Sequence, residues 1–123
     1  LSVRHRLAVA TPKPLRYAAP LVDRLGIGDR ILHVSAPRDD KRRSSKTAEV
    51  AAALAALGVQ RAVMVGDRCF DVEGGQANGI ATVGVLWGIG DRAELEAAGA
   101  DRIVTAPSEL PQTCEELLAA ALP

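Results

Sequence analysis

The fold class of this 123-residue chain follows from one segment, Ala62-Val63-Met64-Val65-Gly66-Asp67-Arg68-Cys69-Phe70-Asp71. Its first half is a short, wholly apolar run that ends in Gly-Asp, which is typical of a strand covered on both faces of a sheet. In open α/β sheets, ligands bind in the crevice outside the carboxyl ends of such strands, so we expect Asp67 to lie there. If the turn that follows is helical, the four-residue spacing returns Asp71 to the side of Asp67.

Two convergent carboxylates suit a magnesium ion. Mg2+ is a hard cation that is held by one or two carboxylates, several waters and a substrate phosphate. The simpler interpretation is a Gly-Asp turn followed by Asp71 near a helix N-terminus, where the helix dipole favours a negative charge. This segment alone leaves both interpretations open.

The composition indicates one globular domain and argues against several classes of function. The 15 basic side chains balance the 15 acidic ones, so no charge excess points to nucleic acid. Residues 38–46 are locally basic but contain two acids and no aromatic residue, which is typical of a solvated loop. No apolar run approaches the ~20 residues of a membrane span. Cys69 and Cys114 are too few for a disulfide framework, so we expect reduced thiols in a cytoplasmic protein.

Strand and helix patterns alternate along the whole chain. Short apolar runs predict strands at residues 7–11, 31–34, 62–65, 81–86 and 102–104. Helices are predicted at residues 14–25, 45–57, from the third strand to about 78, 91–98 and 108–121, the last interrupted early by Pro111. Such alternation predicts an α/β fold with parallel strands and right-handed crossovers, as a single domain over residues 1–123.

Polar side chains gather where these strands end. Thr11 ends the first strand, Asp67 and Asp71 follow the third, and Lys46 opens the helix before the third; the fourth strand ends in Trp87-Gly88-Ile89-Gly90. A hydroxyl, an ammonium group and two carboxylates at one sheet edge suit a phosphate held beside Mg2+. Taken singly, Thr11 reads as a helix N-cap and Lys46 as a solvated lysine. Their joint occurrence in this order favours a phosphate site.

Three motifs resemble those of one enzyme family. Residues 7–14, Leu-Ala-Val-Ala-Thr-Pro-Lys-Pro, resemble the second motif of the haloacid dehalogenase-like (HAD) hydrolases. Lys46 resembles the lysine of their third motif, and Gly66-Asp67-Arg68-Cys69-Phe70-Asp71 resembles the fourth, GDxxxD. The chain is thus similar to the C-terminal part of a HAD-like hydrolase, with phosphoglycolate phosphatase-like members nearest.

The resemblance implies a fold and a reaction. The implied fold is a Rossmann-like core, a parallel sheet with flanking helices. The implied reaction is Mg2+-dependent hydrolysis of a small phosphorylated metabolite through an aspartyl-phosphate. Thr11 would bind the transferring phosphoryl group, Lys46 would stabilise the charge on nucleophile and phosphate, and Asp67 with Asp71 would anchor the Mg2+ ion.

The family's first motif, DxDGT, is absent, because no Asp-x-Asp occurs in the 123 residues. In the family this motif supplies the nucleophile from a strand between those that would carry Thr11 and Asp67. Pro12 also lacks the backbone N–H that related sites often use to hold phosphate. We therefore expect the C-terminal piece of a phosphatase of about 220 residues, without the first strand and the cap domain. Alone it should be inactive.

Two alternatives belong to other classes of protein. The first is a non-catalytic regulatory module that keeps a phosphate or metal site but performs no chemistry. The second is a receiver-like or nucleotide-binding α/β domain. It is the weaker of the two, because the acids of a receiver cluster at the end of the first strand, which here ends in Thr11, and no GxGxxG follows that strand.

Overall fold

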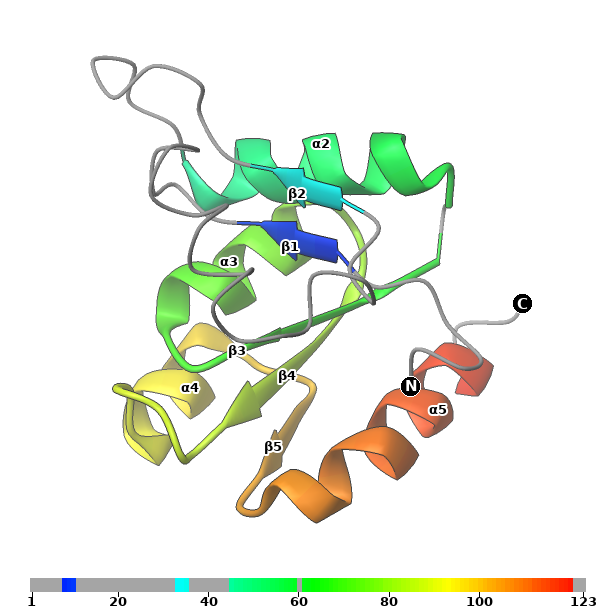
Figure 1. The fold of residues 1–123 in the computed structure, drawn as a ribbon. Coiled ribbons are helices and arrows are strands. Elements are labelled where there is room, and N and C mark those ends of the chain that lie inside the picture. The colour runs from blue at the N-terminus through cyan, green and yellow to red at the C-terminus, as the bar shows by residue number, and fades with distance from the viewer. Residues whose placement is uncertain (1–7, 11–32, 36–44, 60, 121–123) are drawn as a thin grey trace. The chain divides into compact units, whose positions relative to one another are not determined.

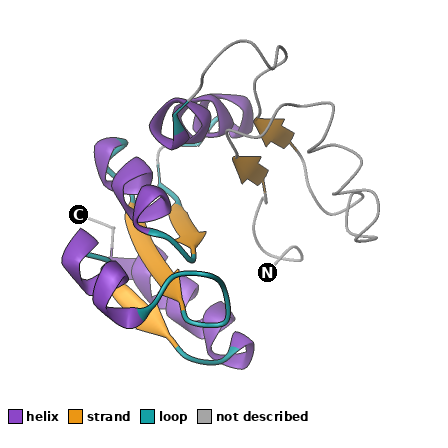
Figure 2. Cartoon of the chain, turned by 90° about the vertical axis from the view of Figure 1, so that its left-hand side faces the viewer, coloured by secondary structure: helices purple, strands orange, loops and turns teal. Residues whose placement is uncertain are grey.

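The computed structural model describes residues 8–10, 33–35, 45–59 and 61–120. The chain divides into two compact units, residues 1–59 and 60–123. In the first unit, strands β1 (Ala8–Ala10) and β2 (His33–Ser35) pair in parallel. Helix α2 (Lys46–Leu57) packs against both strands (Figure 2). The strands predicted at 7–11 and 31–34 are thus confirmed with shifted ends, while the helix predicted at 14–25 lies outside the described residues.

Helix α2 begins and ends where its sequence predicts. The Ser45 hydroxyl accepts a hydrogen bond from the Ala48 N–H at 3.1 Å and caps the N-terminus. Gly58 adopts the left-handed conformation, with φ of 67°, and its N–H bonds to the carbonyls of Leu54 and Ala55. Both capping interactions join residues within four positions of each other, so the local sequence is enough to predict the two helix ends.

The second unit is a three-stranded parallel sheet with β4 in the centre (Figure 1). Its strands are β3 (Val63–Gly66), β4 (Ala81–Val85) and β5 (Arg102–Val104). Its helices are α3 (Cys69–Ala77), α4 (Arg92–Ala98), the 3-10 turn η2 (Pro107–Glu109) and α5 (Leu110–Ala120). This is the predicted α/β alternation with parallel strands.

The sheet of the second unit is covered on both faces. One face packs on α5 through a cluster of valines and leucines: Val63, Val65, Val83, Val85, Val104, Leu110 and Leu117. The strand residues between them face α3 and α4. A Cβ at Gly84 would lie 2.8 Å from Leu95 Cδ1 of α4, and one at Gly75 of α3 would lie 2.6 Å from Thr82 Cγ2. Successive side chains of each strand therefore point alternately toward α5 and toward the layer of α3 and α4.

One expectation needs correction, and another is confirmed with a difference in burial. Pro111 does not interrupt the last helix, because η2 precedes it and α5 begins at Leu110. Pro111 thus lies in the first turn, where a missing N–H is tolerated. The strand before Asp67 is covered on both faces but only half-buried, since β3 pairs with β4 alone among the described strands. Among the described strands, β1 and β3 belong to separate sheets.

No helix in the described part of the chain is long and apolar enough to cross a membrane.

Candidate functional site

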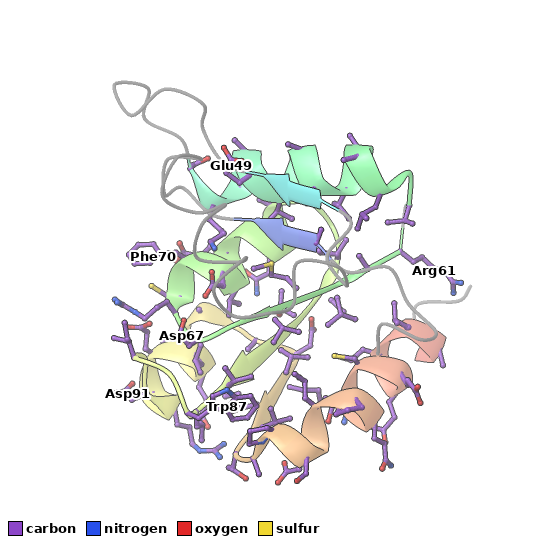
Figure 3. All side chains as sticks on the ribbon, in the orientation of Figure 1. Glu49, Arg61, Asp67, Phe70, Trp87 and Asp91 are labelled. Carbon is purple, nitrogen blue, oxygen red and sulfur yellow. The ribbon has the colours of Figure 1, made fainter. Side chains whose placement is uncertain are left out.

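Asp67 follows β3 directly and meets the loop that follows β4. The register pairs Gly66 with Gly84, so the two segments beyond these residues leave the sheet side by side. The backbone N–H of Ile89 donates to Asp67 Oδ2 at 2.7 Å. Figure 3 shows Asp67 at the end of β3. The carboxylate is half-buried and lies at the carboxyl edge of the sheet, as the sequence predicts.

Asp71 turns back toward Asp67. It is the third residue of α3 and only 7% exposed. Its Oδ2 accepts hydrogen bonds from the backbone N–H of Asp67 at 3.0 Å and of Arg68 at 3.2 Å. The Asp71 side chain thus returns to the backbone of Asp67, while the shared metal site of the two carboxylates stays a prediction. The contacts also show that Asp71 holds the turn itself, because a buried carboxylate that accepts two amides fixes their directions.

Two glycines make room for these carboxylates. A Cβ at Gly66 would lie 2.2 Å from the Asp71 Cβ, and one at Gly88 would lie 2.2 Å from Asp67 Oδ2. Neither glycine has a positive φ. They are therefore required for close approach rather than for an unusual backbone conformation, and the sequence pattern Trp87-Gly88-Ile89-Gly90 carried no signal of this role.

A third carboxylate reaches the same turn from α4. Glu94 Oε2 accepts from Arg68 Nε at 2.8 Å and from the backbone N–H of Cys69 at 2.9 Å. The hydrogen bond from Arg68, followed by that from the Cys69 amide, lowers the pKa of Glu94, and the same contact raises the pKa of Arg68. Sequence reasoning missed Glu94. Its spacing after Asp91 indicates a local capping box, whereas its side chain reaches residues 25 and 26 positions away.

Large exposed apolar side chains occur on the same two segments. Among the described residues they are Phe70, 57% exposed, Trp87, 45%, and Ile89, 83% (Figure 3 labels the first two). The Arg68 guanidinium lies 5.3 Å from the centroid of the Phe70 ring.

The donor set at this turn fits Mg2+. Asp67 and Asp71 offer hard carboxylate oxygens, and Mg2+ sites in proteins use one or two of these with waters and phosphate. Asp67 is accessible enough to contact an ion, while Asp71 is buried against two amides. Within the described ranges no group of three or more His, Cys, Asp or Glu side chains forms a fuller metal cage. Waters and a substrate phosphate are the ligands that complete a Mg2+ site of one or two carboxylates.

The structure does not place the other two predicted site residues, Lys46 and Thr11, beside Asp67. Lys46 is the first residue of α2 and half-buried, and it belongs to the other unit, so its approach to Asp67 stays a prediction. Thr11 lies outside the described residues. The structure thus brings together Asp67 and Asp71, and adds Glu94, Gly66 and Gly88 to them.

Comparison with curated proteins finds relatives among enzymes of phosphoryl transfer. The chain is 39% identical over 114 residues to the tyrosine-protein kinase PtkA of Mycobacterium tuberculosis, covering 91% of this chain and 39% of PtkA. It is 33% identical over 105 residues to the N-acetylmuramic acid 6-phosphate phosphatase of Pseudomonas aeruginosa, covering 83% of this chain and 46% of that protein. The chain therefore spans less than half the length of these relatives.

Comparison with solved structures also finds a phosphatase and PtkA among the similar proteins. A predicted phosphatase from Clostridium acetobutylicum superposes with a TM-score of 0.85 at 29% identity, over 94% of this chain and 54% of that one. The structure of PtkA from Mycobacterium tuberculosis superposes with a TM-score of 0.73 at 34% identity, over 92% and 54%.

The HAD-hydrolase-like family model matches residues 44–110. That range covers more than half of the chain and includes α2 with Lys46, the turn from Asp67 to Asp71, and Glu94. The match joins both motif-bearing segments in one family pattern, and the chain therefore belongs to the HAD-hydrolase-like family.

Proposed function

We propose that this chain supplies part of the active centre of a Mg2+-dependent phosphatase for small phosphomonoesters. The observation that carries the proposal is the turn at the end of β3. There Asp71 accepts the Asp67 and Arg68 amides, while Ile89 holds the Asp67 carboxylate. Family membership and relatives named as phosphatases support the assignment.

In this proposal the two carboxylates have different tasks. Asp67, half-buried and held through one oxygen by the Ile89 amide, contacts the Mg2+ ion. Asp71 keeps Asp67 in place and adds negative charge to the same turn. When bound, the ion supplies electrostatic stabilisation of the phosphoryl oxygens. Lys46 and Thr11 neutralise and bind the phosphate in the same scheme.

The nucleophile of the proposed reaction is an aspartate of a DxDGT motif. Since no Asp-x-Asp occurs in these 123 residues, we expect them alone to give no turnover of a generic aryl phosphate. Mg2+-dependent turnover by the 123-residue chain that is lost in Asp67→Asn would contradict this part of the proposal.

A metal titration tests the site without requiring turnover. Mn2+ replaces Mg2+ in oxygen-ligand sites and is paramagnetic, so its binding to the chain is followed by electron paramagnetic resonance. We expect saturable binding that Mg2+ displaces and that Asp67→Asn weakens strongly. The matched control is Glu96→Gln, which removes an exposed carboxylate whose ion pair stays within α4 and should leave binding unchanged. Equal Mn2+ binding by the parent chain and Asp67→Asn would contradict the assigned site.

A kinase is the second candidate. The relative that is 39% identical carries the name tyrosine-protein kinase, and a kinase needs the same phosphate and Mg2+ contacts with a hydroxyl in place of water as acceptor. A protein that contains this chain and transfers phosphate from ATP to a tyrosine peptide, without hydrolysing phosphomonoesters, would favour this candidate.

A further inference from the structure

Three successive backbone amides of the Asp67 turn are bonded to carboxylates. Asp71 accepts the amides of Asp67 and Arg68 at 3.0 and 3.2 Å. Glu94 accepts the next amide, that of Cys69, at 2.9 Å. Asp71 belongs to the GDxxxD motif itself, whereas Glu94 belongs to α4, which follows β4 in the chain. The conformation of the turn therefore depends on a residue outside the motif.

Glu94 also binds the side chain that lies within the motif. Its Oε2 accepts from Arg68 Nε at 2.8 Å, so one carboxylate oxygen joins a side-chain donor and a backbone donor. The loop between Asp67 and Glu94 is tightly packed at Gly90. A Cβ there would lie 2.0 Å from the Asp67 carbonyl oxygen and 2.9 Å from Glu94 Oε2. Gly90 therefore lies beside both the Asp67 carbonyl and the Glu94 carboxylate, with no room for a side chain.

This ion pair is unsuited to a role in global stability. The Arg68 and Glu94 side chains are 37% and 28% exposed, and pairs in contact with solvent add little to the free energy of unfolding. A neighbouring pair on the same helix offers a comparison. Arg92 and Glu96 lie 3.7 Å apart within α4, with side chains 51% and 60% exposed, and their contact does not join α4 to the Asp67 turn.

We propose that Glu94 is a positioning residue that holds the Asp67–Asp71 turn in the conformation that binds the metal ion. The inference rests on the proposed function, because it assigns Glu94 a task in that same site. Partners that orient metal ligands typically contribute a factor of about 10 to 100 to metal affinity, although they never touch the ion. Glu94 acts in this way through the Cys69 amide and the Arg68 side chain.

The test compares Mn2+ binding by the full chain and three variants, followed by electron paramagnetic resonance. Glu94→Ala removes the acceptor, and we expect at least a roughly tenfold loss of affinity. Glu94→Gln keeps an acceptor oxygen and should recover most of the affinity. Glu96→Ala, the matched control on the same helix, should bind as the parent chain does. Amide exchange followed by NMR should show faster exchange of the Cys69 N–H in Glu94→Ala.

The outcomes separate this inference from the proposed function. Absence of Mn2+ binding by the parent chain would overturn both. Binding by the parent chain with an unchanged affinity in folded Glu94→Ala would overturn the positioning role alone. If circular dichroism shows Glu94→Ala to be unfolded, Glu94→Asp decides, because its shorter side chain cannot reach both donors. A loss of affinity in that folded variant supports the role, and an unchanged affinity overturns it.

Discussion

At the scale of single residues, Asp67 and Asp71 differ in exposure and in partners. Asp71 is 7% exposed and accepts two amides, while Asp67 is half-buried and accepts one. The four-residue spacing predicts that the two carboxylates meet. It does not predict their different exposure and partners, which depend on the backbone directions within the turn and on a loop that is distant in sequence.

The first prediction separates stability from metal binding at these two positions. Asp71→Ala leaves two part-buried amides without their acceptor, so we expect the free energy of unfolding to fall by about 1–3 kcal/mol. Asp67→Ala should lower it by less, because the Ile89 amide is exposed. Both variants should lose Mn2+ binding. The measurement is urea unfolding of the two variants. Equal losses of stability in Asp71→Ala and Asp67→Ala would contradict a mainly structural role for Asp71.

The second prediction compares Gly88, where there is no space for a side chain, with Gly79, where the backbone conformation alone favours glycine. In Gly88→Ala the new Cβ would lie 2.2 Å from Asp67 Oδ2, so the carboxylate must move and Mn2+ affinity should fall. Gly79 has φ of 71° with no atom within 4 Å of a new Cβ. Gly79→Ala should therefore cost about 1 kcal/mol of stability through backbone strain and leave Mn2+ affinity unchanged. An unchanged affinity in Gly88→Ala would be evidence against Asp67 as a ligand.

At the scale of elements, local sequence patterns predict where the helices end, but they do not predict contacts between residues that are distant in the sequence. Ser45 and Asp91 cap their helices through amides three residues away, and Gly58 and Gly99 end them in left-handed conformations. These interactions lie within one turn of the chain and are visible in its pattern. The bonds of Glu94 to the Asp67 turn depend on strand order and helix packing, which no local spacing encodes.

The third prediction tests how α4 is anchored on the sheet. Leu95 is fully buried and packs over Gly84 of β4. Leu95→Ala should lower the free energy of unfolding by about 2–5 kcal/mol, because it leaves a cavity between helix and sheet. Glu96→Ala, one residue further on the exposed side, should change it by less than about 0.5 kcal/mol. Similar effects of the two substitutions, measured by urea unfolding, would contradict the described packing.

The fourth prediction concerns the two free cysteines. Burial of Cys114 within α5 raises the pKa of its thiol, which keeps it protonated and shielded. The contribution of the neutral thiol to stability is complete below the pKa of an unfolded cysteine and is lost as the pH rises through the raised value. At neutral pH a thiol reagent should modify the half-buried Cys69 first and Cys114 only on unfolding. Mass spectrometry of the labelled peptides checks this, and rapid labelling of Cys114 would contradict it.

At the scale of the whole molecule, the order of strands and helices was predictable and the division into two units was not. The composition shows no linker near residue 60, yet the described strands form two sheets, β1-β2 and β3-β4-β5. Pairing of parallel strands is set by long-range packing, so the pattern along the chain does not reveal which neighbours are joined. The placement of Thr11 and Lys46 beside Asp67 belongs to this same scale and stays a prediction.

A chimera tests the central claim that this chain carries the metal-binding part of a phosphatase centre. The segment of the Pseudomonas aeruginosa N-acetylmuramic acid 6-phosphate phosphatase that aligns over 105 residues is replaced by the corresponding residues of this chain, and hydrolysis of a generic aryl phosphate is measured. We predict Mg2+-dependent turnover by the chimera that is abolished by Asp67→Asn. A folded chimera that binds Mn2+ but does not hydrolyse the phosphate ester, or one that is equally active with Asn at position 67, would contradict the account.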